Sequence, residues 1–206
     1  MGIHALSNAP GRASRTVLEE LRQATHGGLA MLYALAPFGG AQRQCIDMAV
    51  GDSDLVELGM TPREVLNVTR SLRTGASGRT ILAYLPEPLE ERVLSEPVPD
   101  EAGPGAIRDN DALLRSFADI RDQGHALGFQ ECSPGWNSCA APVMWGDWIM
   151  GSALLLKPAT LMPHVTPPSS KPPKPPPPSS ATSPNAATPR GSATLRAFSR
   201  PLGSFF

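Results

Sequence analysis

The sequence contains few of the residues that usually mark a catalytic centre. Three of its 206 residues are Cys and four are His, and no two cysteines have the C-x-x-C spacing. No histidine lies in an H-E-x-x-H pattern, no G-x-S-x-G frame surrounds Ser152, and the phosphate-loop pattern G-x-x-x-x-G-K-[ST] is absent. These absences argue against the common hydrolase, metalloprotease and nucleotide-binding classes, and we do not expect an enzyme.

The three cysteines, Cys45, Cys132 and Cys139, are an odd number, and no charged-then-apolar signal segment opens the chain. A cytoplasmic protein with reduced thiols is therefore expected. Cys132 and Cys139 could meet His125 or Glu131 around a metal ion, but their spacing is not that of a closed zinc site. We expect neither a metal nor another cofactor.

Apolar runs long enough to cross a bilayer are also missing. The runs Ser138–Met144 and Trp148–Leu156 have the length of strands, and Gly146-Asp147 separates them. Two such runs joined by a Gly-Asp pair predict an antiparallel hairpin, and His125–Gln130 reads as a third strand beside it. No contact with a membrane is expected.

Acidic residues are absent after Asp147, and this divides the chain by charge. Residues 1–162 carry 13 Lys and Arg against 19 Asp and Glu, a net charge of −6, whereas residues 163–206 carry +5. An acidic body is a poor surface for phosphate contacts, so DNA is expected to bind only weakly through the tail, or through a partner. The tail is rich in proline and is predicted to be disordered.

Helix and strand signals fill the region before the tail. After a loose terminus over residues 1–13, Thr16 and Glu19 form a capping-box pattern that begins a helix, which Gly27 ends. The runs Leu29–Ala36 and Gln42–Val50 flank a turn cluster at residues 37–40 and predict a second hairpin.

Four further helices are predicted. Thr61-Pro62-x-Glu64 begins one that runs to about Arg70, a second covers residues 76–85, and a third covers Leu89–Leu94. Asp109, Asn110 or Asp111 caps the fourth, which ends at Gly124 and has one apolar face: Leu113, Leu114, Phe117 and Ile120. Strands joined by hairpins, with helices packed over them, predict an α+β domain over residues 14–162.

Two blocks of this domain resemble a known family. The first runs from Thr74 to Pro86, TGASGRTILAYLP, and the second combines IRDQG at 120–124 with Glu131, Gly135 and CAAPV at 139–143. Their residues and order resemble the effector-binding domain of IclR-type bacterial transcription regulators. The resemblance implies an antiparallel sheet of GAF-like or profilin-like architecture and a pocket for a small organic effector, often a carboxylate.

Carried onto this chain, the resemblance implies an effector site whose polar groups fall on four segments. They are the small-residue segment, the position after the helix-ending glycine, the alanine-rich strand and the last strand, and the residues concerned are Ala76, Ser77, Gly128, Ser138, Cys139, Leu154 and Leu156. Gly128 replaces the family's aspartate, and Leu154 and Leu156 replace its serines. The effector is therefore expected to be more apolar than a simple carboxylic acid. Nearby aromatic residues are expected to line this pocket or pack in the core: Phe129, Trp136, Trp145 and Trp148.

Two larger departures affect the function. Only about fifteen residues precede the first predicted helix, too few for the family's winged helix-turn-helix, and the proline-rich tail stands in place of its closing helix. A sheet face left uncovered would favour a homodimer. We expect an effector-sensing and dimerising domain that modulates transcription through a DNA-binding partner or domain. Two alternatives are a small enzyme with Cys139 or Cys132 as nucleophile, and a non-functional remnant.

Overall fold

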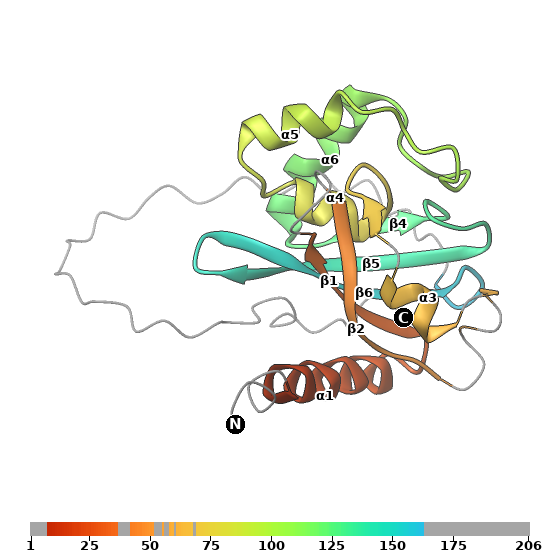
Figure 1. Cartoon of the computed structure of the whole chain (residues 1–206). Coiled ribbons are helices and arrows are strands. Elements are labelled where there is room, and N and C mark those ends of the chain that lie inside the picture. Colours follow the sequence, from red (N-terminus) through yellow and green to blue (C-terminus); the bar gives the residue numbers. More distant parts are fainter. Residues whose placement is uncertain are drawn as a thin grey trace, which may run out of the picture.

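The protein is built on one six-stranded antiparallel sheet (Figure 1). The computed structural model describes residues 8–36, 42–51, 55, 58–59, 61–67 and 69–162. The strand order is β3-β2-β1-β6-β5-β4. Their bounds are β1 Leu29–Leu35, β2 Gln42–Ala49, β3 Thr69–Ser71, β4 Ala126–Phe129, β5 Trp136–Trp145 and β6 Trp148–Pro158. The expected α+β class is confirmed, whereas the 37–40 turn and the tail lie outside the described residues.

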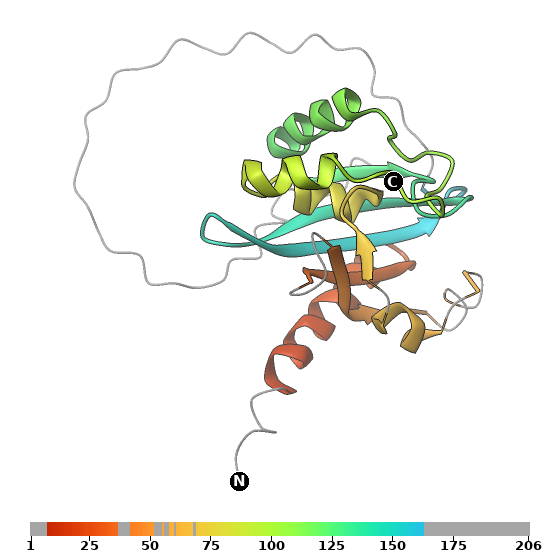
Figure 2. The same ribbon diagram turned by 45° about the horizontal axis from the view of Figure 1, so that its top comes forward.

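Helices cover both faces of the sheet (Figure 2). On one side lies α1 (Asn8–Ala24), against β1 and β2. On the other lie α4 (Gly75–Leu82), α5 (Glu87–Leu94) and α6 (Asn110–Gln123). The larger core lies on this second side, where Phe117 and Ile120 of α6 and Ile81 of α4 are buried with the inward residues of the strands.

The first helix begins earlier than expected. α1 starts at Asn8, so the prediction of a loose terminus is wrong for residues 8–13, and Thr16 lies within the helix. Pro10 falls in the first turn, where a missing backbone N–H costs nothing. The helix ends as expected near Gly27: His26 has a φ of 59°, Gly27 has a φ of 97°, and Gly27 donates its N–H to Arg22 O.

The two predicted hairpins are confirmed. β1 pairs antiparallel with β2, and β5 with β6, where Trp145 faces Trp148 across the two-residue turn. Gly146 has a φ of 58° at the first turn position, where a hairpin of this length favours glycine. The tip of β5–β6 extends past the last β1 pair, Ala34 with Gly151, and exposes Trp145 by 55% and Trp148 by 71%. These two rings are therefore neither core nor pocket residues.

The segment after Thr61 is helical for a shorter distance than expected. α3 (Pro62–Asn67) begins with the expected reciprocal cap, in which Thr61 N–H donates to Glu64 Oε2 and Glu64 N–H to Thr61 Oγ1. Arg70, expected at the end of this helix, instead lies in β3 and pairs with Arg43 of β2. Backbone pairing with β2 therefore replaces the last helical turn.

The helix α6 follows the prediction closely at both ends. Asp109 accepts the N–H of Ala112, and Gly124 ends the helix at φ 77°. Leu113, Phe117 and Ile120 are buried as expected, but Leu114 is 39% exposed. Among the described helices, none is long and apolar enough to cross a membrane.

Candidate effector site

A cavity of about 220 Å³ lies between the sheet and the first turn of α4. An engineered cavity of about 150 Å³ accepts benzene, so this space can hold one aromatic ring with a polar substituent. Its apolar lining consists of Met31, Tyr33, Leu58, Val65, Ala76, Leu154 and Leu156. Its polar lining consists of Arg43, Arg70, Ser77, Cys132, Ser133 and Ser138.

The sheet register brings the strand residues of this lining together. Leu154 of β6 pairs with Met31 of β1, and Leu156 pairs with Ser138 of β5. Because paired residues of antiparallel strands point to the same face, all four side chains project toward the face of the sheet that α4 covers. Tyr33, two residues beyond Met31, extends the same row.

Most of the residues expected from the resemblance lie at this cavity. Ala76, Ser77, Ser138, Leu154 and Leu156 line it. Their role in binding an effector stays a prediction, but the geometry brings residues of three segments to one space.

Gly128, the sixth expected residue, lies directly beside Ser138 and α4. A Cβ on Gly128 would stand 2.6 Å from Ser138 Oγ and 3.2 Å from Ala76 Cβ. The place where the family carries an aspartate is therefore closed by the first turn of α4, and an aspartate here would require α4 or Ser138 to move.

Cys139 lies on the other face of the sheet. It follows Ser138 on β5 and pairs with Leu127 and Leu155, so strand alternation turns it away from the cavity. It is not among the described residues that line the cavity, and burial raises the pKa of its thiol to about 11. Cys139 is therefore not part of the proposed site.

Arg43 is the main lining residue that sequence reasoning missed. Its side chain is buried, at 1% exposure, and Nη1 donates to the Ser71 carbonyl while Nη2 lies 4.0 Å from Cys132 Sγ. Nε has no hydrogen-bond partner. Among the described residues no carboxylate forms an ion pair with this guanidinium. A charged residue at an inward position of the Gln42–Val50 run is the sequence signal that could have revealed it.

The aromatic ring of Tyr33 lies against the Arg43 guanidinium. The guanidinium carbon lies 5.4 Å from the ring centroid, within the range of a cation–π contact. Burial raises the pKa of the Tyr33 phenol to about 12, although the nearby Arg43 charge acts in the opposite direction. The phenol is therefore neutral near pH 7 and does not supply a counter-charge.

The N-terminus of α4 points into the same cavity. Its N-cap residue, Thr74, makes no side-chain hydrogen bond to the first turn, and the first-turn residues Ala76 and Ser77 line the cavity. Free N–H groups at the start of a helix favour anions. Together with Arg43 and Arg70, they give the cavity a positive potential, and none of its described lining residues is acidic.

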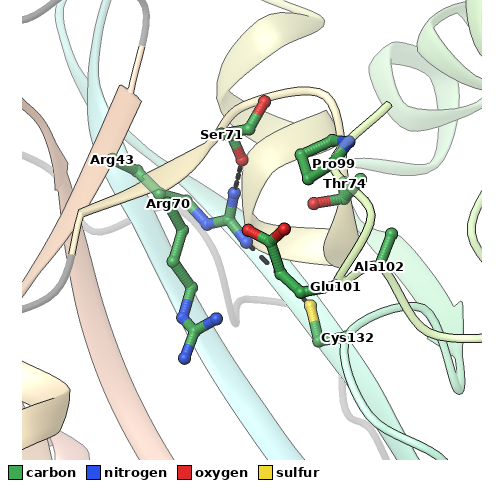
Figure 3. A pocket seen from close by; sticks show the side chains of 8 residues that line it. All are labelled: Arg43, Arg70, Ser71, Thr74, Pro99, Glu101, Ala102 and Cys132. Atoms are coloured by element: carbon green, nitrogen blue, oxygen red, sulfur yellow. Dashed lines mark hydrogen bonds between the residues drawn. The ribbon is translucent and has the colours of Figure 1, made fainter. Parts of the chain in front are cut away.

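A smaller hollow adjoins the cavity (Figure 3). Arg43, Arg70 and Cys132 line both spaces, and Glu101 lines only the hollow. Figure 3 shows the Arg43 guanidinium between Ser71 and Cys132, with Glu101 nearby.

A second buried arginine holds α4 against the start of the β4–β5 loop. Arg79 Nε lies 3.1 Å from Glu131 Oε2 and Nη2 lies 2.5 Å from Oε1, and Nη2 also donates to the Leu127 carbonyl at 2.6 Å. Both side chains are 5% exposed. This bidentate pair, together with the bond to Leu127, holds α4 against β4 and the loop that follows it, and so helps shape the cavity wall.

A protein-family comparison matches the part of the chain that carries α4 to β5. Residues 65–146 match the model described as "Bacterial transcriptional regulator IclR C-terminal". This segment is similar to IclR-type C-terminal domains. The elements that add Tyr33, Arg43, Leu154 and Leu156 to the cavity lie outside this matched segment.

The chain is also similar to a curated relative and to solved structures. A protein of Halobacterium salinarum described as an HTH-type transcriptional regulator, ArcR, is 39% identical over 74 residues, which are 36% of this chain and 28% of the relative. A structure described as an IclR transcriptional regulator from Silicibacter sp. TM1040 has a TM-score of 0.64 at 23% identity, covering 78% of this chain and 61% of that one.

An IclR homologue from Microbacterium hydrocarbonoxydans, complexed with 4-hydroxybenzoate, has a TM-score of 0.63 at 19% identity and covers 81% of this chain and 68% of that one. At these identities the structural likeness shows the fold alone. The chain spans about a quarter of the length of the curated relative, and less than two thirds of the Silicibacter structure.

Among the described residues, no three His, Cys, Asp or Glu side chains come together as metal ligands would.

Proposed function

We propose that this IclR-type domain senses an organic acid with an apolar body of about one aromatic ring. One observation carries the proposal: Arg43 is buried in a largely apolar cavity, and no described carboxylate pairs with it. A buried charge without a partner costs several kcal/mol. A ligand carboxylate would supply the missing partner, and the uncapped start of α4 would donate to it as well.

The remaining lining favours an effector that is not a small polar acid. Leu154 and Leu156 present alkyl groups where hydroxyls were expected from the resemblance, and Met31 lies beside them. An apolar body gains about 25 cal/mol per Å² buried there. The relative from Microbacterium, whose complex contains 4-hydroxybenzoate, supports this class of ligand.

Calorimetric titration of the full chain tests the proposal. The probes are 4-hydroxybenzoate, its neutral amide 4-hydroxybenzamide, and pyruvate. We expect 4-hydroxybenzoate to bind at least tenfold more tightly than either of the others. Arg43→Met should remove the preference for the acid over the amide, because only the acid uses the guanidinium.

Arg115→Met is the matched control, since Arg115 is exposed on α6 and does not line the cavity. If Arg43→Met bound 4-hydroxybenzoate as tightly as the natural chain does, the proposal that Arg43 binds the carboxylate would be wrong. Absence of binding by every acid in a broader panel would favour a non-functional remnant.

A cysteine enzyme is the rival function, and the chemistry of Cys139 argues against that residue as nucleophile. Its thiol pKa, raised to about 11 by burial, leaves it protonated near neutral pH. A thiolate, not a thiol, is the attacking species. We therefore favour a regulator, acting in the cytoplasm through a DNA-binding partner or domain, over an enzyme that uses Cys139.

We also infer that the chain forms a homodimer through the β5–β6 tip. Trp145, Trp148 and Met150 are each more than half exposed there. An apolar patch can pair with its own copy across a two-fold axis. Sedimentation should show the dimer of the full chain lost in the double variant Trp145→Ser, Trp148→Ser. It should persist in the control Leu161→Ser, which changes an exposed leucine elsewhere.

A further inference from the structure

Cys132 is an exposed thiol placed directly at the anion-binding end of the cavity. It lies in the loop between β4 and β5, and it lines both the cavity and the adjoining hollow. Its Sγ is 4.0 Å from Arg43 Nη2. Gly75, the first residue of α4, leaves room for this sulfur, because a Cβ there would stand 2.4 Å from Sγ.

The surroundings of Cys132 point independently to an anion. Arg43 is buried, its Nε lacks a hydrogen-bond partner, and no described carboxylate pairs with it. Thr74 leaves the first turn of α4 without a side-chain cap. Arg70 adds a second guanidinium to the lining, and Glu101 is the one acidic residue among the described lining of the hollow. A negative charge formed on Cys132 would therefore meet the same groups that we assign to the effector carboxylate.

The other two thiols differ from Cys132 in burial. Cys45 is 1% exposed, and burial raises the pKa of its thiol to about 12. Cys139 faces away from the cavity, and burial raises the pKa of its thiol to about 11. Both should stay protonated and react slowly, so they serve as internal references within the same chain.

We propose that Cys132 is an oxidation site for hydroperoxides, and that its anionic product occupies the Arg43 and α4 site in place of the effector carboxylate. The competition rests on the proposed function; the oxidation site does not. The domain would then respond to two signals, an organic acid and a peroxide, at one site.

The chemistry needs only the hydroperoxide as co-reactant. Sγ attacks the peroxide, an S–O bond forms and the O–O bond breaks. The departing oxygen takes the thiol proton and leaves as water or an alcohol, so sulfur is oxidised by two electrons and the peroxide reduced by two. A second equivalent converts the sulfenic acid to a sulfinic acid, which loses its proton to give the sulfinate.

Two variants of nearly equal shape test the anion site without any ligand. Cys132→Asp places a carboxylate where the sulfinate would lie, and Cys132→Asn places a neutral amide there. We expect the full chain with Asp to melt about 3–6 °C above the chain with Asn at pH 7, and the difference to vanish as the carboxylate is protonated in acid. An Asp variant that melts at or below the Asn variant would overturn the proposal.

Peroxide treatment of the full chain tests the reaction and the competition. Peptide mass analysis should find Cys132 oxidised at least tenfold faster than Cys45 and Cys139. Equal rates would refute the oxidation site. Peroxide treatment should weaken the affinity of the natural chain for 4-hydroxybenzoate at least tenfold. The same treatment should not change the affinity of the Cys132→Ser variant. If the reduced natural chain binds no acid, the proposed function fails, while the comparison of Asp with Asn still decides this proposal.

Discussion

Arg79 and Arg43 are two buried arginines, the first on α4 and the second beside α4, and only the first has a carboxylate partner among the described residues. Arg79 donates two hydrogen bonds to the Glu131 carboxylate and one to the Leu127 carbonyl. The Arg43 guanidinium donates to the Ser71 carbonyl, lies 4.0 Å from the Cys132 sulfur and contacts the Tyr33 ring, but no described carboxylate pairs with it. Removing the partner of a buried, paired charge strongly destabilises the fold. A buried charge that has no partner in the fold can instead gain one from a bound ligand, which favours binding.

The difference follows from where the two side chains lie. Arg79 and Glu131 both fall within the matched IclR-type segment, and their pair connects α4 to the loop after β4. Arg43 reaches the cavity from β2, outside that segment, and its guanidinium also lies close to Gly78 of α4. Arg79, which is paired with Glu131, therefore stabilises the wall of the cavity. Arg43, which has no carboxylate partner among the described residues, supplies the positive charge inside it.

The largest effect is expected from removing the partner of Arg79. Glu131→Gln keeps the size of the side chain but leaves a buried guanidinium without a counter-charge, so the free energy of unfolding should fall by about 3–5 kcal/mol. Urea unfolding followed by circular dichroism at pH 7 measures this change.

The double variant Arg79→Met, Glu131→Leu is the matched control. It removes both charges together, so it should be clearly more stable than Glu131→Gln alone. A loss below about 1 kcal/mol for Glu131→Gln would mean that water already shields this pair, and that its contrast with Arg43 is smaller than the geometry suggests.

A smaller effect is expected at Gly75, which leaves room for the Cys132 sulfur near Arg43. Gly75→Ala puts a Cβ 2.4 Å from Cys132 Sγ at a φ of 76°, and should cost about 2–3 kcal/mol. Gly124→Ala has nearly the same φ, 77°, with no atom within 4 Å of its Cβ, and should cost about 1 kcal/mol. Equal losses in thermal unfolding would show that the space beside Gly75 is not tightly occupied.

Local signals in the sequence were sufficient for much of the fold. The Gly146-Asp147 pair predicted the β5–β6 hairpin, and Asp109 and Thr61 predicted helix starts, because each of these features is decided by neighbours within a few residues. β3 was missed because three residues at a sheet edge have no periodicity, and only pairing with β2 makes them a strand.

The site was predictable only where the family resemblance reached. Ser77 and Ser138 were located by motif, but Cys139 in the same motif points to the other face, since strand alternation separates neighbours. The inward position of Arg43 on its strand could be read from the sequence, but its lack of a carboxylate partner could not, because that depends on which distant segments lie around it. The exposure of Trp148 likewise depends on how far β1 extends beside β6.

The role of Tyr33 beside Arg43 can be tested by pH. Burial raises the pKa of its phenol to about 12 in the folded chain, above the usual value of 10. The neutral phenol is thus favoured by folding, and its contribution is complete below pH 10 and lost as the pH rises through 12. At pH 11 the loss is about 1.4 kcal/mol.

Tyr33→Phe should therefore flatten the fall in stability between pH 10 and 12 without changing the fall that begins near pH 9 from the buried Cys45 thiol. Urea unfolding at stepwise pH values measures both slopes. An unchanged profile in Tyr33→Phe would mean that the Tyr33 phenol ionises near its usual pKa of 10 and that burial does not hold it neutral.

The smallest effect on stability is expected at Arg43 itself. Arg43→Met loses the hydrogen bond to the Ser71 carbonyl and the contact with the Tyr33 ring, which together stabilise the fold by about 1–3 kcal/mol. It also removes the cost of holding an unpaired charge in the interior, which is of similar size and opposite sign. The free energy of unfolding without ligand should therefore change by less than about 1 kcal/mol, while acid binding is lost. A loss as large as that of Glu131→Gln would make Arg43 a structural residue like Arg79, and the charge of the cavity would then have to be satisfied within the fold rather than by an effector.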